Sequence, residues 1–193
     1  MAQAARPHRV TAEEYLRLER EAEIKSEYYF GEVFAMAGGS ANHSALAFSL
    51  AGIVHAQMKG KPCRGFSSDL RVRTSPEGLY AYPDLTILCG EPEYHDERSD
   101  TLTNPTVIFE VLSPTTESFD RGDKRRAFWA IGALQAYVLV SQKQLLVEVY
   151  ERTGDSEGKF ATYSDSDAVA QIPSLGISIP LAELYEGVDF GTG

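Results

Sequence analysis

Apolar residues recur along this chain with two periods, and each period predicts a different kind of element. Apolar side chains three or four residues apart follow the loop GGSANH and predict a helix over about 42–59. The segment TAEEYLRLERE places Thr11 three residues before Glu14, a capping pattern that predicts a short helix. A third helix is predicted over 120–132, in DRGDKRRAFWAIG.

Strands are predicted where apolar residues alternate or run together. KSEYYFGEVFAMAG has the pattern of a hairpin that bends at Gly31. CRGFSSDLRVR, at 63–73, alternates like a half-buried strand, whereas 80–89 and 106–113 are apolar on both faces, like central strands of a covered sheet. Further strands are expected at 136–141 and 145–152, and an edge strand with one helical turn is expected in GISIPLAELYEG.

The order of these elements is helix, hairpin, helix, three strands, helix and further strands, without a repeat or a linker. This order predicts an α/β (α+β) fold with a central mixed β-sheet flanked by helices. The length of 193 residues suits one domain, which we assign to 1–193, with a core at about 11–187 and short flexible termini.

Charge and cysteine usage narrow the class of protein. A formal net charge of −10 argues against a protein that coats nucleic acid through broad phosphate neutralisation, although a nuclease needs only a local cationic groove. Cys63 and Cys89 lie in separate apolar runs without metal-binding spacing, so we expect reduced core thiols. The longest apolar tract, ALAFSLAGIV, is too short to span a bilayer, and the N-terminal segment lacks a secretory pattern. We therefore expect a cytoplasmic protein without a membrane partner.

Two carboxylates interrupt runs that otherwise consist of buried residues. Asp84 and Glu110 each lie in a predicted central strand. Burying an isolated charge there costs on the order of several kcal/mol unless a proton, a partner or a metal compensates it. Since two such acids on neighbouring strands would repel each other, the simplest remedy is a hard divalent cation between them. Carboxylate oxygens, a backbone carbonyl and waters form the ligand set that Mg²⁺ prefers.

Lys124 is predicted to face the same region. On a helix it shares a stripe with Ala127, Phe128 and Ile131, the residues that must pack on the sheet. An ammonium group there could orient a metal-bound water or stabilise developing negative charge. The carboxylates and the amine are therefore expected to serve one metal-centred site.

These residues fall in ordered motifs, which are PD at 83–84, EVLSP at 110–114 and DRGDK at 120–124. The chain in this respect resembles the restriction-endonuclease-like PD-(D/E)XK superfamily and, more narrowly, the Uma-two family of endonucleases. The resemblance extends over nearly the whole chain, because EYYFGEVFAMAG, the Asn42–His43 pair, SSDLRVR and IPSLGISIPLAELY also fit the family.

The resemblance implies that Asp84 and Glu110 hold Mg²⁺, with Mn²⁺ as a substitute, and that Glu27 is a further acidic residue near the site. His43 matches a recurrent family position, and the dipole of its helix predicts a neutral, hydrogen-bonded imidazole. The chain departs from the superfamily pattern two residues past Glu110, where Leu112 stands in place of lysine. In this family the following helix is thought to supply the amine, which fits Lys124.

Each candidate residue also has a structural alternative. Asp84 could be a strand-end carboxylate held by backbone amides, and Glu110 could form a purely structural ion pair with Lys124. Lys124 could instead extend past Phe128 to solvent, which would remove the proposed chemistry. Glu27 could form a surface pair across the hairpin, with Glu32 as a competing acid, and His43 could be a helix-cap residue.

Three functions are compatible with these observations. The leading hypothesis is a metal-dependent endonuclease that hydrolyses phosphodiester bonds in DNA through a Mg²⁺-activated water. A second is a catalytically reduced module of the same fold that acts by oligomerisation or nucleic-acid binding. The third, a glycoside hydrolase with Asp84 and Glu110 as acid and base, leaves Lys124 without a task. Exposed edge strands further suggest a homodimer.

Overall fold

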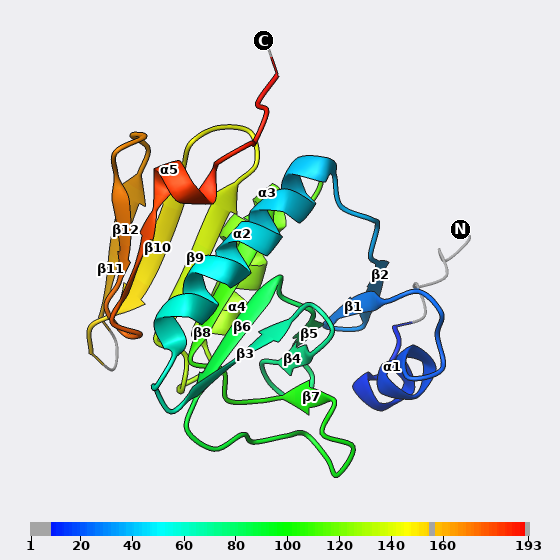
Figure 1. The fold of residues 1–193 in the computed structure, drawn as a ribbon. Helices are drawn as coiled ribbons and strands as arrows, with labels where there is room; N and C mark the ends of the chain where they lie inside the picture. The colour runs from blue at the N-terminus through cyan, green and yellow to red at the C-terminus, as the bar shows by residue number, and fades with distance from the viewer. Residues whose placement is uncertain (1–8, 155–156, 192–193) are drawn as a thin grey trace.

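The computed structural model describes residues 9–154 and 157–191, and the outermost residues of the predicted flexible termini lie outside this range. A six-stranded sheet forms the centre of the molecule (Figure 1). Its strands, in spatial order, are β11 (Gly158–Tyr163), β10 (Val147–Arg152), β9 (Ala136–Ser141), β8 (Val107–Leu112), β6 (Leu85–Cys89) and β3 (Cys63–Ser67). Strands β8 and β9 are parallel and the other neighbours are antiparallel, so the predicted mixed sheet is confirmed.

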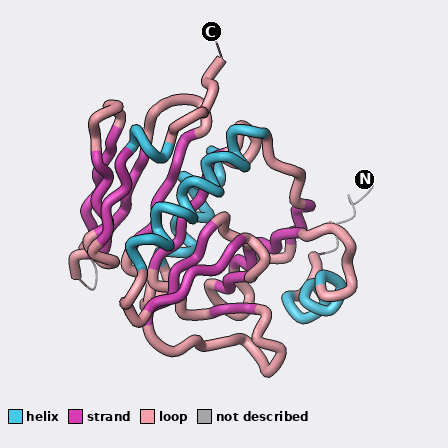
Figure 2. The backbone as a smooth tube through the Cα atoms, in the orientation of Figure 1, coloured by secondary structure: helices cyan, strands magenta, loops and turns pink. Residues whose placement is uncertain are grey.

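A second sheet of five short strands lies beside the first (Figures 1 and 2). Its order is β2 (Glu32–Ala35), β1 (Ser26–Tyr29), β5 (Leu79–Ala81), β4 (Arg71–Arg73) and β7 (Thr101–Leu102). Strands β1 and β2 form the predicted hairpin, which bends at Gly31 with a φ of 95°. Because side chains strain at such a φ, glycine suits this position.

Helices cover both faces of the six-stranded sheet. On one face, α2 (Ala41–Met58) packs Leu46 and Leu50 against Val107 and Phe109 of β8. On the other, a helical segment runs through α3 (Glu117–Phe119), the π-helical turn η1 (Asp120–Lys124) and α4 (Arg125–Trp129). Its Phe128 packs with Ile108 and Leu112, which point to the opposite side of β8 because side chains alternate along a strand. The two predicted helices are thus confirmed, although the second ends at Trp129 rather than near Gly132.

The remaining elements close the two ends of the fold. Helix α1 (Ala12–Glu19) begins at Thr11, whose side-chain oxygen accepts a hydrogen bond from the Glu14 amide, as the capping pattern predicts. Its Tyr15 stacks on Tyr28 of β1, with ring centroids 5.2 Å apart. The C-terminal elements are β12 (Val169–Ile172), β13 (Ile177–Pro180) and α5 (Leu181–Leu184).

Two predicted strands are wrong in one respect, because the structure breaks each into two pieces that belong to different sheets. The 63–73 segment turns at Ser67–Leu70 between β3 and β4, and the 80–89 segment breaks at Tyr82–Asp84 between β5 and β6. Pro83 lacks the amide hydrogen that would continue a ladder. The chain therefore leaves the small sheet after β5 and enters the large sheet at β6, and Asp84 is the last residue of the break between them.

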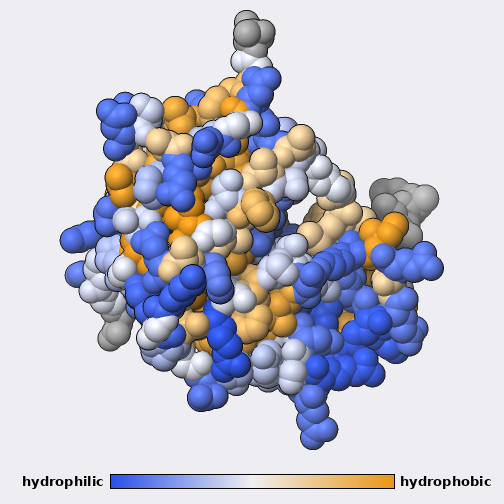
Figure 3. Space-filling model, viewed as in Figure 1, coloured by the Kyte–Doolittle hydropathy of each residue, from blue (hydrophilic) through white to orange (hydrophobic). Residues whose placement is uncertain are grey.

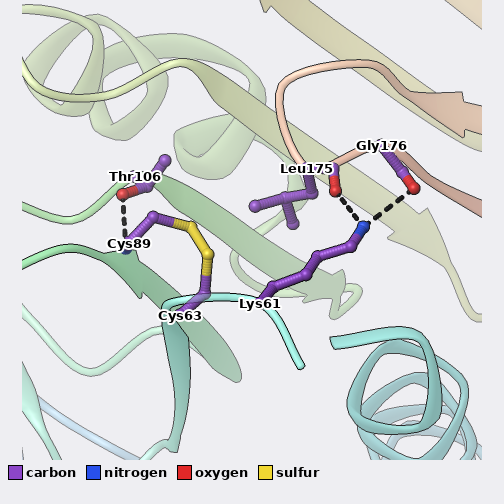
Figure 4. The surroundings of a disulfide bond; sticks show 6 residues. All are labelled: Lys61, Cys63, Cys89, Thr106, Leu175 and Gly176. Atoms are coloured by element: carbon purple, nitrogen blue, oxygen red, sulfur yellow. Dashed lines mark hydrogen bonds between the residues drawn. A yellow bond between two sulfur atoms is a disulfide. The ribbon is translucent and has the colours of Figure 1, made fainter. Parts of the chain in front are cut away.

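The prediction of reduced cysteines is also wrong. Cys63 of β3 lies directly opposite Cys89 of β6, and the two form a disulfide (Figure 4). The Cys89 amide donates a hydrogen bond to Thr106 Oγ1, and Lys61 Nζ donates to the carbonyl oxygens of Leu175 and Gly176 nearby. The pairing could not be read from the sequence, because it depends on the register between β3 and β6.

Across the described residues, we find no helix that combines the length and the apolar character needed to cross a membrane.

Candidate functional site

The candidate site lies where the two sheets meet. A pocket of about 390 Å³ is lined by Glu27 from the small sheet, Glu110 from the large sheet, Asp84 from the break between them, and Lys124 from the covering helical segment. The connection 36–40, between β2 and α2, forms one wall of this pocket. In the space-filling view an opening is visible between this connection and α2 (Figure 3).

Lys124 and Glu110 meet inside the protein. The Lys124 Nζ atom lies 3.0 Å from Glu110 Oε1, and each residue is only 5% exposed. Residues Ile108, Glu110 and Leu112 share the face of β8 that the helical segment covers, which explains why the two side chains converge. The alternative in which Lys124 extends to solvent is excluded, whereas a purely structural ion pair remains compatible with this geometry.

Two more carboxylates contact the same ammonium group. Lys124 Nζ donates a hydrogen bond to Glu27 Oε1 at 3.1 Å, and Asp120 Oδ1 lies 3.5 Å away. Glu27 Oε1 also accepts a hydrogen bond from the Tyr82 amide. The carboxylate of Glu27 thus points into the site rather than forming a surface pair, and Glu32 is exposed.

Asp120 is a residue that the sequence analysis missed. Its spacing of four residues from Lys124 was the available signal, since residues at this spacing lie on one helix face. Its second oxygen, Oδ2, accepts a hydrogen bond of 2.6 Å from Thr116 Oγ1. In the structure, the π-helical turn from Asp120 to Lys124 carries both residues to the buried side of the segment.

The cluster holds more negative than positive charge. Burial raises the pKa of Glu110 well above its usual range, and Lys124 offsets this only in part because Asp120, Asp84 and Glu27 add repulsion. Burial disfavours the charged form of Lys124, but Glu110, Glu27 and Asp120 outweigh that effect and raise its pKa. Lys124 is therefore protonated, and the surplus of carboxylates favours binding of a proton or a cation at Glu110.

Asp84 and His43 form a second pair at the edge of the pocket. Asp84 Oδ2 accepts a hydrogen bond of 2.7 Å from the Val111 amide, which lies beyond the β6–β8 ladder. Its structural role as a strand-end carboxylate is therefore real, but the same oxygen also lies 3.4 Å from His43 Nε2. This contact raises the pKa of His43, although burial opposes it. The direction of this shift is opposite to the one predicted from the helix dipole, because the carboxylate of Asp84 faces the ring.

His43 is held in place by its surroundings. Ser40 caps α2 by accepting a hydrogen bond from the His43 amide, and the His43 ring lies beside Asp84. Gly39 lies against this ring, and a Cβ atom at Gly39 would come within 2.8 Å of His43 Nδ1. The glycine is thus needed for close approach rather than for an unusual backbone angle.

The donor atoms fit the magnesium ion that the resemblance implies. Glu110 Oε1 and Asp120 Oδ1 are buried acceptors whose ion-pair partner among the described residues is Lys124 Nζ, at 3.0 Å and 3.5 Å, in a geometry that does not form a regular hydrogen bond. No group of three His, Cys, Asp or Glu side chains within 9–154 and 157–191 has the arrangement of a metal site. Asp84 and Glu110 would therefore be the protein ligands, with the others from the backbone, water or substrate, as is common for Mg²⁺.

Two curated relatives are similar over most of their length. An uncharacterized protein of Synechocystis sp., slr1290, is 33% identical over 183 residues, which cover 94% of each chain. A second from the same organism, sll1609, is 36% identical over 148 residues, covering 77% of this chain and 84% of its own.

A solved structure shows the same architecture. The crystal structure of "a putative nuclease belonging to DUF820" from Anabaena variabilis superposes with a TM-score of 0.76 over 92% of this chain and 98% of that chain. At 21% identity this likeness concerns the fold, and it confirms the predicted restriction-endonuclease-like class. The model of the Uma2 family, described as "Putative restriction endonuclease", matches residues 12–182. Since this match covers most of the sequence, the chain belongs to the Uma2 family.

Proposed function

We propose that this protein is a metal-dependent endonuclease that hydrolyses phosphodiester bonds in DNA, with Mg²⁺ as its cofactor and Mn²⁺ as a substitute. Membership of the Uma2 family and the fold of the Anabaena protein support a nuclease in general. The observation that carries the proposal is the approach of Lys124 to Glu110 in a pocket that Asp84 also lines. Two acids and an amine in one recess form a set suited to phosphoryl chemistry.

The residues of the chain have separate roles in this proposal. Asp84 and Glu110 would hold the ion, which when bound would activate a water and neutralise charge on the phosphate. Glu27 orients Lys124 through its hydrogen bond, and the longer contact of the amine with Asp120, at 3.5 Å, is the one that a phosphate oxygen or the attacking water would replace. His43, whose Nε2 atom lies 3.4 Å from Asp84 Oδ2 at the edge of the pocket, contacts a phosphate oxygen beside the ion.

The test is cleavage of single-stranded DNA and of plasmid by the purified wild type and its Asp84→Asn and Glu110→Gln variants, with and without a chelator. We expect wild-type cleavage that requires Mg²⁺ or Mn²⁺ and a loss of at least about a hundredfold in each variant. Glu32→Gln is the matched control, because Glu32 lies exposed on the same hairpin. Retained cleavage in either site variant, with the fold intact, would exclude this mechanism.

A catalytically reduced module is the second candidate. It is favoured by Leu112, which is 2% exposed and occupies the usual lysine position, and by the absence of a three-residue metal site in the described ranges. A calorimetric titration with Mg²⁺ and Mn²⁺ separates the two candidates. Binding that Glu110→Gln abolishes supports the nuclease, whereas no binding at millimolar concentration supports the module.

We also propose that the protein is a homodimer. Strand β3 is an edge of the six-stranded sheet, and a groove of about 450 Å³ between it and α2 is lined by apolar residues such as Val54, Phe66 and Ile87. An open edge beside an apolar groove can pair with a second copy. Sedimentation velocity tests the dimer, and a monomer at all concentrations would contradict it.

A further inference from the structure

An aromatic side chain stands at the mouth of the candidate site. Phe34 of β2 pairs directly with Glu27 of β1, and cross-strand partners project from the same face of a hairpin. Glu27 reaches inward to Lys124, whereas Phe34 lines the pocket and remains 48% exposed. The hairpin register thus fixes an aromatic ring next to the reactive groups.

The ring of Phe34 packs against the ring of another aromatic residue. Its centroid lies 6.4 Å from that of Phe119, at an interplanar angle of 36°, and Phe119 in turn meets Tyr29 edge to face at 5.3 Å. Phe119 belongs to the helical segment that carries Lys124, so the hairpin and this segment are joined beside the pocket. A single exposed aromatic residue is ordinary on a protein surface, but its position here is specific.

The pocket offers little positive charge for phosphates. Its only basic residues are His43 and Lys124, and Lys124 already contacts three carboxylates. Arg121 pairs with Glu148, and Arg125 lies over the ring of Tyr150 at 4.6 Å, so these nearby cations have protein partners. A substrate must therefore gain affinity from something other than broad phosphate neutralisation.

We propose that Phe34 stacks on a nucleobase of the substrate and that the site takes single-stranded or locally unpaired nucleic acid. This inference rests on the proposed nuclease function. An unpaired base exposes its face to an aromatic ring, whereas a base inside a duplex is already stacked. The recessed position of Glu110, 5% exposed, also favours a flexible strand that can bend into the pocket over a rigid duplex.

The test compares wild type, Phe34→Ala and Phe34→Trp on a short oligonucleotide, single-stranded and as its duplex. Binding is measured by fluorescence anisotropy in chelator, and KM and kcat are measured with Mg²⁺. We expect tighter binding of the single strand and, in Phe34→Ala, about a tenfold rise in KM with kcat nearly unchanged. Phe34→Trp should restore the affinity, because its ring also stacks.

Phe48→Ala is the matched control, since Phe48 is 83% exposed on α2 and does not line the pocket. Sedimentation of each variant identifies any change in assembly. The stacking proposal alone would be overturned if the wild type cleaves and Phe34→Ala has the same KM. It would equally be overturned if the wild type prefers the duplex, or if Phe34→Ala changes only the assembly of the protein. If the wild type neither binds nor cleaves either oligonucleotide, the proposed nuclease function fails with it.

Discussion

Lys124 Nζ lies 3.0 Å from Glu110 Oε1, although the two residues belong to a helical segment and to the strand that it covers. In the superfamily pattern the amine comes from the strand itself, two residues past the acid, where this chain has Leu112. Leu112 instead packs with Phe128 between the strand and the helical segment. The ammonium group of Lys124 extends from that segment toward the strand and meets Glu110. The fold can thus bring an amine to the acid from a different element.

Lys124→Met should destabilise the protein strongly at neutral pH, because it leaves the buried carboxylates of Glu110 and Asp120 and the half-buried carboxylate of Glu27 without their shared cation. We expect a loss of about 3 kcal/mol in the free energy of unfolding, measured by urea denaturation in chelator. Adding Glu110→Gln should recover part of this loss, since one buried charge is removed. Lys143→Met, which breaks an exposed pair with Glu117, serves as the control and should cost under about 1 kcal/mol.

The loss in Lys124→Met should also depend on pH. The pKa of Glu110 is raised in the folded protein well above its ordinary value of 4.5, and removal of the amine raises it further. A group whose pKa is raised by folding stabilises fully below its unfolded pKa and loses that contribution as the pH rises through the folded pKa. The variant should therefore approach wild-type stability below about pH 4.5 and fall away from it as the pH rises through the folded pKa that Glu110 has in the wild type, which lies well above 4.5. A cost that is constant from pH 4 to pH 8 would contradict the buried cluster.

Gly39→Ala should displace His43 without unfolding the protein. The new Cβ would lie 2.8 Å from His43 Nδ1, so the ring must move away from its contact with Asp84. In an NMR titration of metal-free protein, the pKa of His43 should drop from its raised value toward 6.5. Gly38→Ala is the matched control, because a Cβ there meets nothing within 4 Å. An unchanged pKa in Gly39→Ala would show that Asp84 does not set it.

Asp100→Asn should weaken the attachment of α1 in a pH-dependent way. Burial alone would raise the pKa of Asp100, but hydrogen bonds from Arg20 and Thr101 and the charge of Arg71 lower it to about 2. A carboxylate whose pKa is lowered by folding stabilises the folded protein above its unfolded pKa of 3.8, and this contribution is lost as the pH falls toward 2. The variant should therefore have a lower free energy of unfolding than wild type at neutral pH. With a third of the side chain exposed, we expect about 1 kcal/mol.

Urea denaturation between pH 2 and pH 7 checks this, and the difference from wild type should shrink between about pH 4 and pH 2. Asp165→Asn, at an exposed position, is the control. A difference that persists unchanged to pH 2 would show that the charge of Asp100 is not responsible.

Removal of the disulfide should destabilise the fold. Cys63 and Cys89 are 26 residues apart, and closing a loop of this length restricts the unfolded chain by about 3 kcal/mol. Reducing agent should lower the unfolding midpoint of wild type but not that of the Cys63→Ala/Cys89→Ala double variant. Thiol titration of the native protein without reductant should find no free thiol, and two reactive thiols would contradict the pairing.

The elements that local pattern alone can specify were predicted from the sequence. The apolar run of β8, the hairpin bend at Gly31 and the inward stripe that carries Lys124 each follow from spacing within one segment. Strand β11 was missed because it is a mostly exposed edge strand, whose inner face offers only Ala161 and the half-buried Tyr163 to the core.

Features that depend on how segments meet could not be predicted. The disulfide depends on the register between β3 and β6, which pairs Cys63 with Cys89. The break near Pro83 depends on how β5 and β6 pair with other strands, which places them in different sheets. Asp120 resembles a solvated helix residue until its neighbours bury it. The charge state of His43 was predicted from its own helix dipole, whereas its contact with Asp84 decides the direction of the shift.

The most direct test of the central claim is anomalous diffraction from crystals of the wild-type protein soaked in Mn²⁺. If Asp84 and Glu110 hold a catalytic ion, the map should contain a peak in contact with both carboxylates, and the peak should vanish in Glu110→Gln crystals soaked in the same way. A peak that survives in Glu110→Gln, or the absence of any peak beside these two residues in wild type, would contradict the claim.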